Sequence, residues 1–599
     1  MISEILLFNE KNVKKIVKNY LPLNQIDRNL FSSIIWNLKK NKCRYILIET
    51  DYIDRDFSED YSTYYSTLFL EVGKKCCRLH FFSHLQNQDI SSLFGEGRTA
   101  YLCFDFLAHH KTGKESKNGG LAVNLSDLKG SYLGFVIILP TIDRVIGRTI
   151  IKSDLFCKEK NGYYCTTSCE SSVNIEGIPF TVKGMPFIQQ DERVGVCSST
   201  AIWMITCYMN IRYKFQRSSL TNITEMANIY HKINRPFPAL RGLMSEQIIA
   251  SLSNLGYDAI HYQKRTFQKN KWNPKEIIYK YIESELPVIA VIGGQHVCTI
   301  IGHDFDLGKN ITDEKNKDNK IISNSSFITC FVTHDDLKGP YQLLPVEFAL
   351  PLFDDREYLN PFKEQANIYT DYTILDVTNI IIPIFKKVYL EGQVIENIIS
   401  IVFSYESYIF KYYRYLIKNT FSLLDTDTVI IGEKFIKDIS SKEIFYRTRF
   451  LLSNHLKEDY LIHKSNTSPF IRNRYSQIDL PRYVWLIELF FEKELRSKII
   501  QEGKNAKIVI GEILVDATGN DAMYAVIAVH FPGIVFINNM YDPINLKNSS
   551  EEDSTDENGF FDEKSEFFLE NDHFIAYEIP KDTPYELYDR ERAKTLESC

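Results

Sequence analysis

The sequence has no long apolar run and no surplus of positive charge. Apolar stretches such as residues 380–385 are far shorter than the roughly 20 residues that cross a bilayer. The chain has 70 lysines and arginines against 77 aspartates and glutamates, a formal net charge of −7. Proteins that bind a phosphate backbone normally present a basic face. We therefore expect no membrane-spanning segment and no nucleic-acid partner.

Cysteine is sparse, and its spacing is not that of a zinc site. Twelve cysteines in 599 residues are too few for a disulfide scaffold. The loose group Cys157, Cys165 and Cys169 has neither paired CxxC spacing nor a nearby histidine. The first residues form a short apolar run with Glu4 where a secretory signal would carry a basic residue. We expect reduced thiols, no metal or other cofactor, and a cytoplasmic protein.

The composition is that of a globular protein with more than one domain. Hydrophobic residues make up 44% of the chain and charged residues 25%, close to globular averages. A chain of 599 residues exceeds what one core normally organises. We predict an N-terminal α+β accessory domain over 1–175, a central domain over 176–352 and a C-terminal mixed α/β accessory domain over 353–599. An acidic, low-complexity run near 548–566 predicts a disordered loop.

Helical and strand periodicities alternate along the chain and predict the α+β class. Helices are expected over 11–20, 26–40, 388–418 and 481–501. Strands are expected over 44–49, 132–139, 506–516 and 522–530. The charged insertion 307–320 predicts a hairpin tip between two strands.

The residues around Cys197 indicate a nucleophile at the start of a buried helix. A polar stretch with a glycine, residues 189–196, precedes it, and small hydroxyl residues and then a largely apolar run follow. A helix N-terminus favours the thiolate, the form in which cysteine attacks. The Cys197 amide can donate to an oxyanion, and Gln190, with Gln189 in reserve, is the expected second donor.

Two downstream segments predict the partners of this cysteine. Residues 285–302 indicate a strand, a Gly-rich turn and a second strand that begins at His296, the expected general base. The next strand, 327–335, ends at Asp335. A neighbouring strand would bring that carboxylate beside the imidazole, where it fixes the tautomer and stabilises the imidazolium.

In this order and spacing, the motifs resemble the C39-like branch of the papain-like cysteine peptidases. The resemblance covers about Met185 to Tyr341 and rests on Q-x(6)-C, then P-V-I-A…G-x-H-V, then H-D-D…G-P-Y. It implies a central papain-like fold, with a Cys-bearing helix packed on an antiparallel sheet, flanked by α+β accessory domains. It also implies a Cys197, His296 and Asp335 triad with Gln190 as oxyanion donor.

The sequence departs from the family pattern and leaves rivals for two roles. Ser198 stands where glycine is common, and Gln190 lies one position further upstream than in the tightest pattern. Asp336 competes with Asp335 as the orienting carboxylate, since the family often has Asp-Pro there. His303 and His334 could also be taken for the base; His303 follows Gly302, at the position usually taken by Tyr in the family, and ranks well below His296.

The expected activity is hydrolysis of a peptide or isopeptide bond in a protein substrate through a thioester acyl-enzyme. The same triad serves acyltransferases and transglutaminases, in which an amine replaces water, and a catalytically silent peptide-binding module would keep the same geometry. The large flanking regions predict a protein partner that binds outside the central domain.

Overall fold

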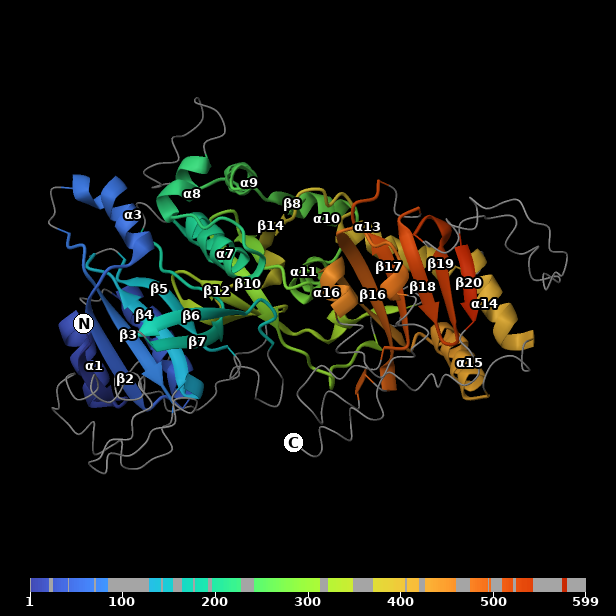
Figure 1. Ribbon diagram of the computed structural model, residues 1–599, viewed down its shortest axis with the longest axis horizontal. Helices are drawn as coiled ribbons and strands as arrows, with labels where there is room; N and C mark the ends of the chain where they lie inside the picture. The colour runs from blue at the N-terminus through green and yellow to red at the C-terminus, as the bar shows by residue number, and fades with distance from the viewer. Residues whose placement is uncertain are drawn as a thin grey trace. The chain divides into compact units, whose positions relative to one another are not determined.

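The computed structural model divides the chain into two compact units (Figure 1). Unit 1 comprises Met1–Pro274, Glu285–Phe305 and Thr329–Lys386, and unit 2 comprises Lys275–Ser284, Asp306–Ile328 and Lys387–Cys599. The structure describes residues 2–20, 25–40, 42–68, 72–83, 129–141, 144–153, 164–175, 178–191, 196–227, 242–312, 321–347, 370–404, 407–419, 426–458, 475–493, 495–496, 509–520, 524–541 and 574–578. The predicted acidic loop at 548–566 and the tip residues 313–320 lie outside this set.

The first part of unit 1 is a five-stranded antiparallel sheet in the order β1-β2-β3-β4-β5. Its strands are β1 (Ile2–Leu7), β2 (Tyr45–Tyr52), β3 (Cys76–Phe82), β4 (Tyr132–Ile138) and β5 (Ile146–Ile151). The helical segments of this region are α1 (Glu10–Tyr20), α2 (Gln25–Lys40), α3 (Arg55–Thr63) and η1 (Tyr65–Thr67). The predicted helices over 11–20 and 26–40 and the predicted strands over 44–49 and 132–139 are confirmed. The hairpin β6 (Cys169–Ile175) and β7 (Ile178–Gly184) follows.

The second part of unit 1 is a six-stranded antiparallel sheet in the order β13-β12-β10-β9-β14-β8. Its strands are β8 (Asp258–Gln263), β9 (Val288–Ile292), β10 (His296–His303), β12 (Cys330–Asp335), β13 (Gly339–Pro345) and β14 (Val377–Ile384). The helical segments are α7 (Cys197–Tyr213), α8 (Leu220–Met226), α9 (Ser245–Asn254), α10 (Lys264–Lys269) and η4 (Ile374–Asp376). The long helix α7 packs on β10 (Figure 1).

The central sheet contains chain from beyond residue 352, the predicted end of the central domain. Strand β14 pairs with β9 on one side and β8 on the other. The two sheets of unit 1 also share contacts, because Thr149 on β5 pairs with Phe187 and the Tyr341 hydroxyl donates to the carbonyl of Ile151 over 2.7 Å. Residues on both sides of the expected boundary at 175 therefore belong to one compact unit.

Unit 2 is built on a seven-stranded sheet in the order β11-β15-β16-β17-β18-β19-β20. The strands are β11 (Ile322–Ser323), β15 (Ile444–Leu452), β16 (Tyr483–Phe491), β17 (Gly511–Asp516), β18 (Val526–Phe531), β19 (Ile534–Asn538) and β20 (Phe574–Glu578). All neighbours pair antiparallel except β11 and β15. The helical segments are α11 (Pro274–Glu283), α13 (Gly392–Val402), α14 (Tyr408–Asn419), α15 (Thr426–Ser440), α16 (Ser453–Glu458), η3 (Asn324–Phe327) and η6 (Asn539–Tyr541). Phe403, Tyr413 and Phe435 contact Phe531 of β18 and form an aromatic core.

The predicted helix over 481–501 is wrong, because residues 483–491 form strand β16. Every residue of this strand is buried, so both of its faces require apolar side chains and the alternation typical of a half-exposed strand is lost. The predicted helix over 388–418 is two helices, α13 and α14. The strands predicted over 506–516 and 522–530 are confirmed by β17 and β18.

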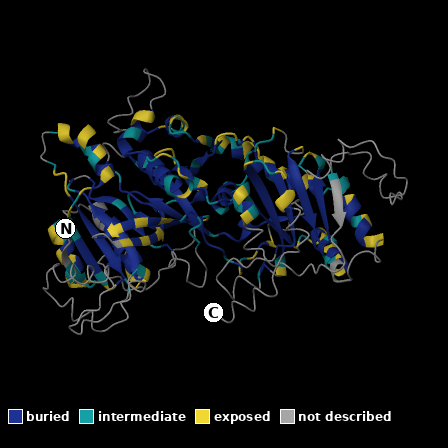
Figure 2. Cartoon of the chain, viewed as in Figure 1, coloured by how far each residue is buried: buried dark blue, intermediate teal, exposed yellow. Residues whose placement is uncertain are grey.

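Burial follows the sheets in both units, with exposed positions mainly on the helices (Figure 2). The α+β class and the antiparallel character of the central sheet are as predicted. Across the described residues, helices that are both long and apolar enough to cross a membrane are absent.

Candidate active site

Cys197 is the first residue of α7, as predicted. The residue before it, Val196, is extended and gives no side-chain cap, and the first helical bond runs from the Thr200 amide to the Val196 carbonyl over 2.9 Å. The amides of the first turn therefore have no acceptor within the helix. From Ser198 to Met209 the helix is buried, whereas Cys197 is half-buried. The thiol thus lies where a buried helix reaches the surface.

His296 is the first residue of β10, and a tight turn places it there. Gly293 and Gly294 have φ angles of 55° and 73°, a region that favours glycine, and they join β9 to β10. His296 pairs with Ile292 across this turn. The apolar residues that follow hold β10 in the core, so the imidazole is fixed at the end of a rigid strand.

Asp335 is the last residue of β12, the strand next to β10, and it meets His296. Its Oδ2 lies 3.1 Å from His296 Nε2. The Asp335 side chain is 1% exposed and that of His296 is 19% exposed. Antiparallel pairing of Thr299 with His334 sets this register. The carboxylate predicted to orient the imidazole is therefore the one that contacts it.

The charges around His296 favour the imidazolium. Burial opposes the charged ring, but hydrogen bonds to Asp335 and Cys197, together with the charges of Asp335 and Asp336, outweigh burial and raise the pKa of His296 to about 11. Because Nε2 faces Asp335, Nδ1 is the ring nitrogen left for Cys197. The structure thus brings together Cys197, His296 and Asp335.

Tyr372 is a member of this group that the sequence did not reveal. Its hydroxyl donates to Asp335 Oδ2, and its ring packs against the His296 ring with centroids 5.7 Å apart. The amides of Leu337 and Lys338 donate to the other carboxylate oxygen over 2.9 and 3.1 Å. Burial opposes the charge of Asp335, but its hydrogen bonds from His296 and Tyr372 lower the carboxyl pKa below its usual value.

Asp336 lies beside the triad but is bonded to the helix. Its Oδ2 accepts from the Thr200 hydroxyl over 3.1 Å, and its buried Oδ1 has no hydrogen-bond partner among the described residues. Burial is the main cause that raises the pKa of Asp336 to about 7; the charge of His296 opposes this rise and that of Asp335 adds to it. Asp336 is not the carboxylate on His296 Nε2.

The two glutamines upstream of Cys197 differ in their surroundings. Gln189 is buried, and its Oε1 accepts from the amide of Ile146 over 2.9 Å. Gln190 is half-buried, and none of the described hydrogen bonds joins it to Cys197 or His296. Residues 192–195, between the glutamines and the helix, lie outside the described set. Gln190 as oxyanion donor stays a prediction, and Gln189 is engaged with β5.

The two rival histidines lie elsewhere in the core. His334 is completely buried between Phe187 and Tyr341, with ring centroids 5.5 and 4.9 Å away, and burial lowers its pKa to about 3. His303 is buried at the far end of β10, where its Nδ1 lies 2.6 Å from the carbonyl oxygen of Asp304. Neither contact involves Cys197.

The carboxylates and imidazole of this site also form a possible cation site. His296, Asp335 and Asp336 each offer one ligand atom, and these atoms lie within 4.8 Å of one another. Among the described residues, this is the one group of three or more His, Cys, Asp or Glu side chains whose possible ligand atoms lie this close together. An imidazole with two carboxylates suits a divalent transition metal, so a test of the site must control for bound metal.

Comparisons of the chain with family models, with curated proteins and with solved structures give no match. The geometry described above therefore carries the functional argument.

Proposed function

We propose that the protein is a cysteine peptidase of the papain-like class that cleaves a peptide or isopeptide bond of a protein substrate. The observation that carries the proposal is the meeting of three segments, distant in sequence: His296 is hydrogen-bonded to Asp335, and the Cys197 thiol lies near enough to His296 to raise its pKa. Cys197 opens a buried helix, His296 opens a strand, and Asp335 ends the adjacent strand. A thiol at a helix N-terminus beside an oriented imidazolium is the arrangement that favours a reactive thiolate.

In the proposed reaction the Cys197 sulfur attacks the carbonyl carbon of the scissile amide. The C–N bond breaks as His296 gives its proton to the leaving amine, and a thioester to Cys197 remains. Water then attacks the thioester while His296 accepts its proton, and the C–S bond breaks to release a carboxylic acid and the thiol. Asp335 holds the imidazole and its charge throughout. The backbone amide of Cys197 and the side chain of Gln190 are proposed to stabilise the oxyanion.

The proposal is tested by the reactivity of Cys197 towards iodoacetamide at neutral pH, measured by intact mass and peptide mapping. Cys165 is an internal control, because it is half-buried like Cys197 and is in no disulfide. We expect Cys197 to label faster than Cys165 in the wild type and to slow in His296→Ala, with the rate at Cys165 unchanged. The reaction is run with and without EDTA, since a cation on His296 would mask the site. Slow labelling of Cys197 in both proteins would contradict the proposal.

Two further measurements separate the alternatives on the same site. A thiol-reactive peptide probe that forms an adduct at Cys197 distinguishes an enzyme from a silent peptide-binding module. Addition of an amine acceptor to a substrate reaction distinguishes a hydrolase from an acyltransferase, because only the transferase yields the amide conjugate. The substrate is proposed to be a protein or peptide that reaches Cys197 at the helix end.

A further inference from the structure

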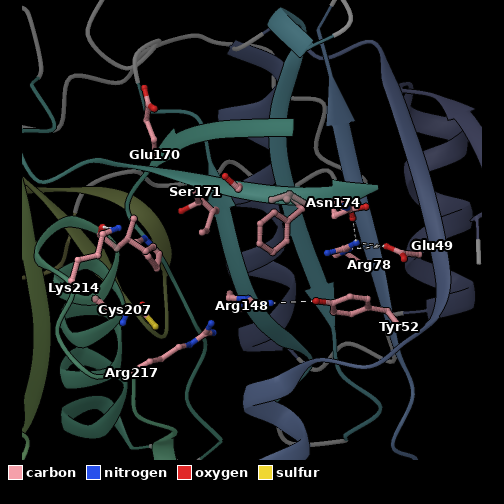
Figure 3. Close-up of a pocket in the computed structure, with 17 residues that line it drawn as sticks. Glu49, Tyr52, Arg78, Arg148, Glu170, Ser171, Asn174, Cys207, Lys214 and Arg217 are labelled. Atoms are coloured by element: carbon pink, nitrogen blue, oxygen red, sulfur yellow. Dashed lines mark hydrogen bonds and ion pairs between the residues drawn. The ribbon is translucent and has the colours of Figure 1, made fainter. Parts of the chain in front are cut away.

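A cavity of about 890 Å³ lies in unit 1, away from the Cys-His-Asp group (Figure 3). Strands β2 to β6 and the last turns of α7 line it, and Cys207, Asn210 and Lys214 mark the α7 side. Cys197 begins this helix and Lys214 follows its end, so at 1.5 Å per residue the two lie roughly 25 Å apart. The volume is in the range of small-molecule sites. The cavity is therefore a second candidate site.

Positive side chains gather around the cavity from several elements. Arg78 comes from β3, Arg148 from β5, Lys214 from the end of α7 and Arg217 from the segment after it. Figure 3 shows the side chain of Arg217 extending from the α7 side toward Arg148. Glutamates 49 and 170 are the acidic residues of the lining. Asp54 and Asp56, behind the lining, pair with Arg148 and Arg217, so the hydrogen-bond donors and not the net charge decide which ligand the cavity suits.

Two of these arginines have donors left over after their ion pairs are made. Arg148 Nη2 donates to Asp54 over 2.8 Å and to the Tyr52 hydroxyl over 3.3 Å, and Arg217 Nη2 donates to Asp56. The Nε atoms of both arginines are buried and have no hydrogen-bond partner among the described residues. These Nε atoms are enclosed by protein, but both side chains are partly exposed, at 18% and 23%, and Nη1 of each makes none of the described hydrogen bonds, so Nη1 is the donor that an oxyanion can reach.

Of the two lining carboxylates, Glu49 is already engaged, and Glu170 is exposed and points away from the arginines (Figure 3). Glu49 accepts from Arg78 over 2.7 Å, and Asp54 and Asp56 hold the other two arginines. A cation entering the cavity would find Glu49, Asp54 and Asp56 occupied, whereas an anion could reach the partly exposed guanidinium groups of Arg148 and Arg217. The cavity therefore favours a ligand that accepts hydrogen bonds over one that donates them.

The lining also has an apolar and aromatic part. Phe135, Ile150 and Val173 contribute to it, and the Arg78 guanidinium lies 4.1 Å from the centre of the Tyr52 ring. We infer that the cavity binds a small molecule in which a phosphate or carboxylate group is attached to an apolar or aromatic body. The oxyanion is held by Arg148 and Arg217, whose planar guanidinium groups suit such groups. This inference does not depend on the proposed peptidase activity.

The experiment is ligand-observed saturation-transfer NMR on the full chain. Phenyl phosphate and benzoate are the observed ligands, and inorganic phosphate is the competitor. Phenyl phosphate is expected to bind more tightly than inorganic phosphate by about 10-fold or more, because its ring contacts the apolar part of the lining. Benzoate distinguishes a carboxylate ligand from a phosphate one. Absence of saturation transfer from the wild type at about 10 mM phenyl phosphate and benzoate would overturn the inference.

The variant that tests the arginines is Arg148→Lys with Arg217→Lys, which keeps a positive charge next to each aspartate but removes the planar guanidinium groups and their second N–H₂ donors. We expect affinity for the oxyanion probes to fall by about 10-fold or more. Arg212→Lys is the matched control, because Arg212 is on α7 but pairs with Glu285 outside the cavity. Unchanged binding in the double variant would overturn the assignment of the arginines.

A second variant keeps the test valid if the double variant does not fold. Ile211 lines the cavity from α7 and is half-buried. Ile211→Trp narrows the cavity and leaves all three arginine ion pairs intact. We expect it to weaken binding of phenyl phosphate while the urea midpoint stays close to that of the wild type. Binding with unchanged affinity would place the ligand elsewhere and overturn the inference.

Discussion

Thr200 Oγ1 donates to Asp336 Oδ2 over 3.1 Å. This bond joins the first turn of α7, three residues after Cys197, to the residue that follows the last position of β12. The same hydroxyl lies 2.9 Å from the Cys197 carbonyl oxygen. The helix that carries the thiol is therefore tied to the strand end that carries the carboxylate on His296.

Asp336→Asn is expected to change the pH dependence of stability. The pKa of Asp336 is raised to about 7 by burial, so the folded protein binds a proton that the unfolded chain releases near pH 4. This contribution is full below pH 4 and is lost as pH rises through 7. From pH 4 to 7 the wild type should lose stability relative to the variant by up to about 1.4 kcal/mol per pH unit, measured by urea unfolding. A difference in unfolding free energy between the two proteins that stays constant from pH 4 to 7 would contradict the raised pKa of Asp336.

Asp335→Ala is expected to slow the labelling of Cys197 more than Asp336→Ala does. Asp335 holds His296 Nε2 directly, whereas Asp336 holds Thr200. Loss of a hydrogen bond to a charged group costs about 1.5–3 kcal/mol, which corresponds to a rate effect of about 10-fold or more. The measurement is the iodoacetamide rate at Cys197 in each variant. The opposite order would show that Asp336 is the orienting carboxylate.

Tyr372→Phe tests a positioning residue. The substitution removes the hydroxyl that donates to Asp335 but keeps the ring that packs on His296. We expect the free energy of unfolding to fall by about 1–2 kcal/mol. We also expect the iodoacetamide labelling rate at Cys197 and the pKa of His296, measured by NMR titration, to change together. Tyr389→Phe is the control, because that side chain is 63% exposed. A loss of stability with no change in the His296 titration would reduce Tyr372 to a packing role.

Lys280→Met is expected to destabilise unit 2. Lys280 Nζ lies 2.5 Å from Glu396 Oε2 and 2.9 Å from Gln393 Oε1, and the Lys280 side chain is 1% exposed. The substitution leaves Glu396 buried without its partner, at a cost of about 3–5 kcal/mol. The double variant with Glu396→Leu removes both charges and should recover most of this loss in urea unfolding. Failure to recover it would show that the cost comes from packing.

The positions of the three catalytic candidates could be predicted because each marks the end of a strongly apolar element. The apolar run after Cys197 required a buried helix, and the Gly293-Gly294 turn fixed where β10 begins. The pairing of adjacent strands then brought His296 to Asp335. Each of these predictions depends only on the residues that directly precede and follow the site residue in the sequence.

Other features depend on contacts that no local pattern specifies. Tyr372 lies 37 residues after Asp335 in sequence, and only the folded chain places its hydroxyl on that carboxylate. The pattern before it gives no reason to single out one tyrosine among 36. Strand β16 was mistaken for a helix because burial of both its faces removes alternation. The charged residues after Phe491 lengthen the helix-like pattern, so the length of the run does not distinguish a strand from a helix here.

The place of β14 in the central sheet has a consequence for synthesis of the chain. A nascent chain that ends before residue 377 already contains Cys197, His296 and Asp335, yet β8 and β9 each lack the strand that separates them. Their open edges can pair with other chains, and closing the sheet requires contacts between residues 85 to 126 positions apart, which form slowly. Translation past residue 384 is therefore the step at which this sheet first becomes complete and the edges of β8 and β9 that face β14 are covered.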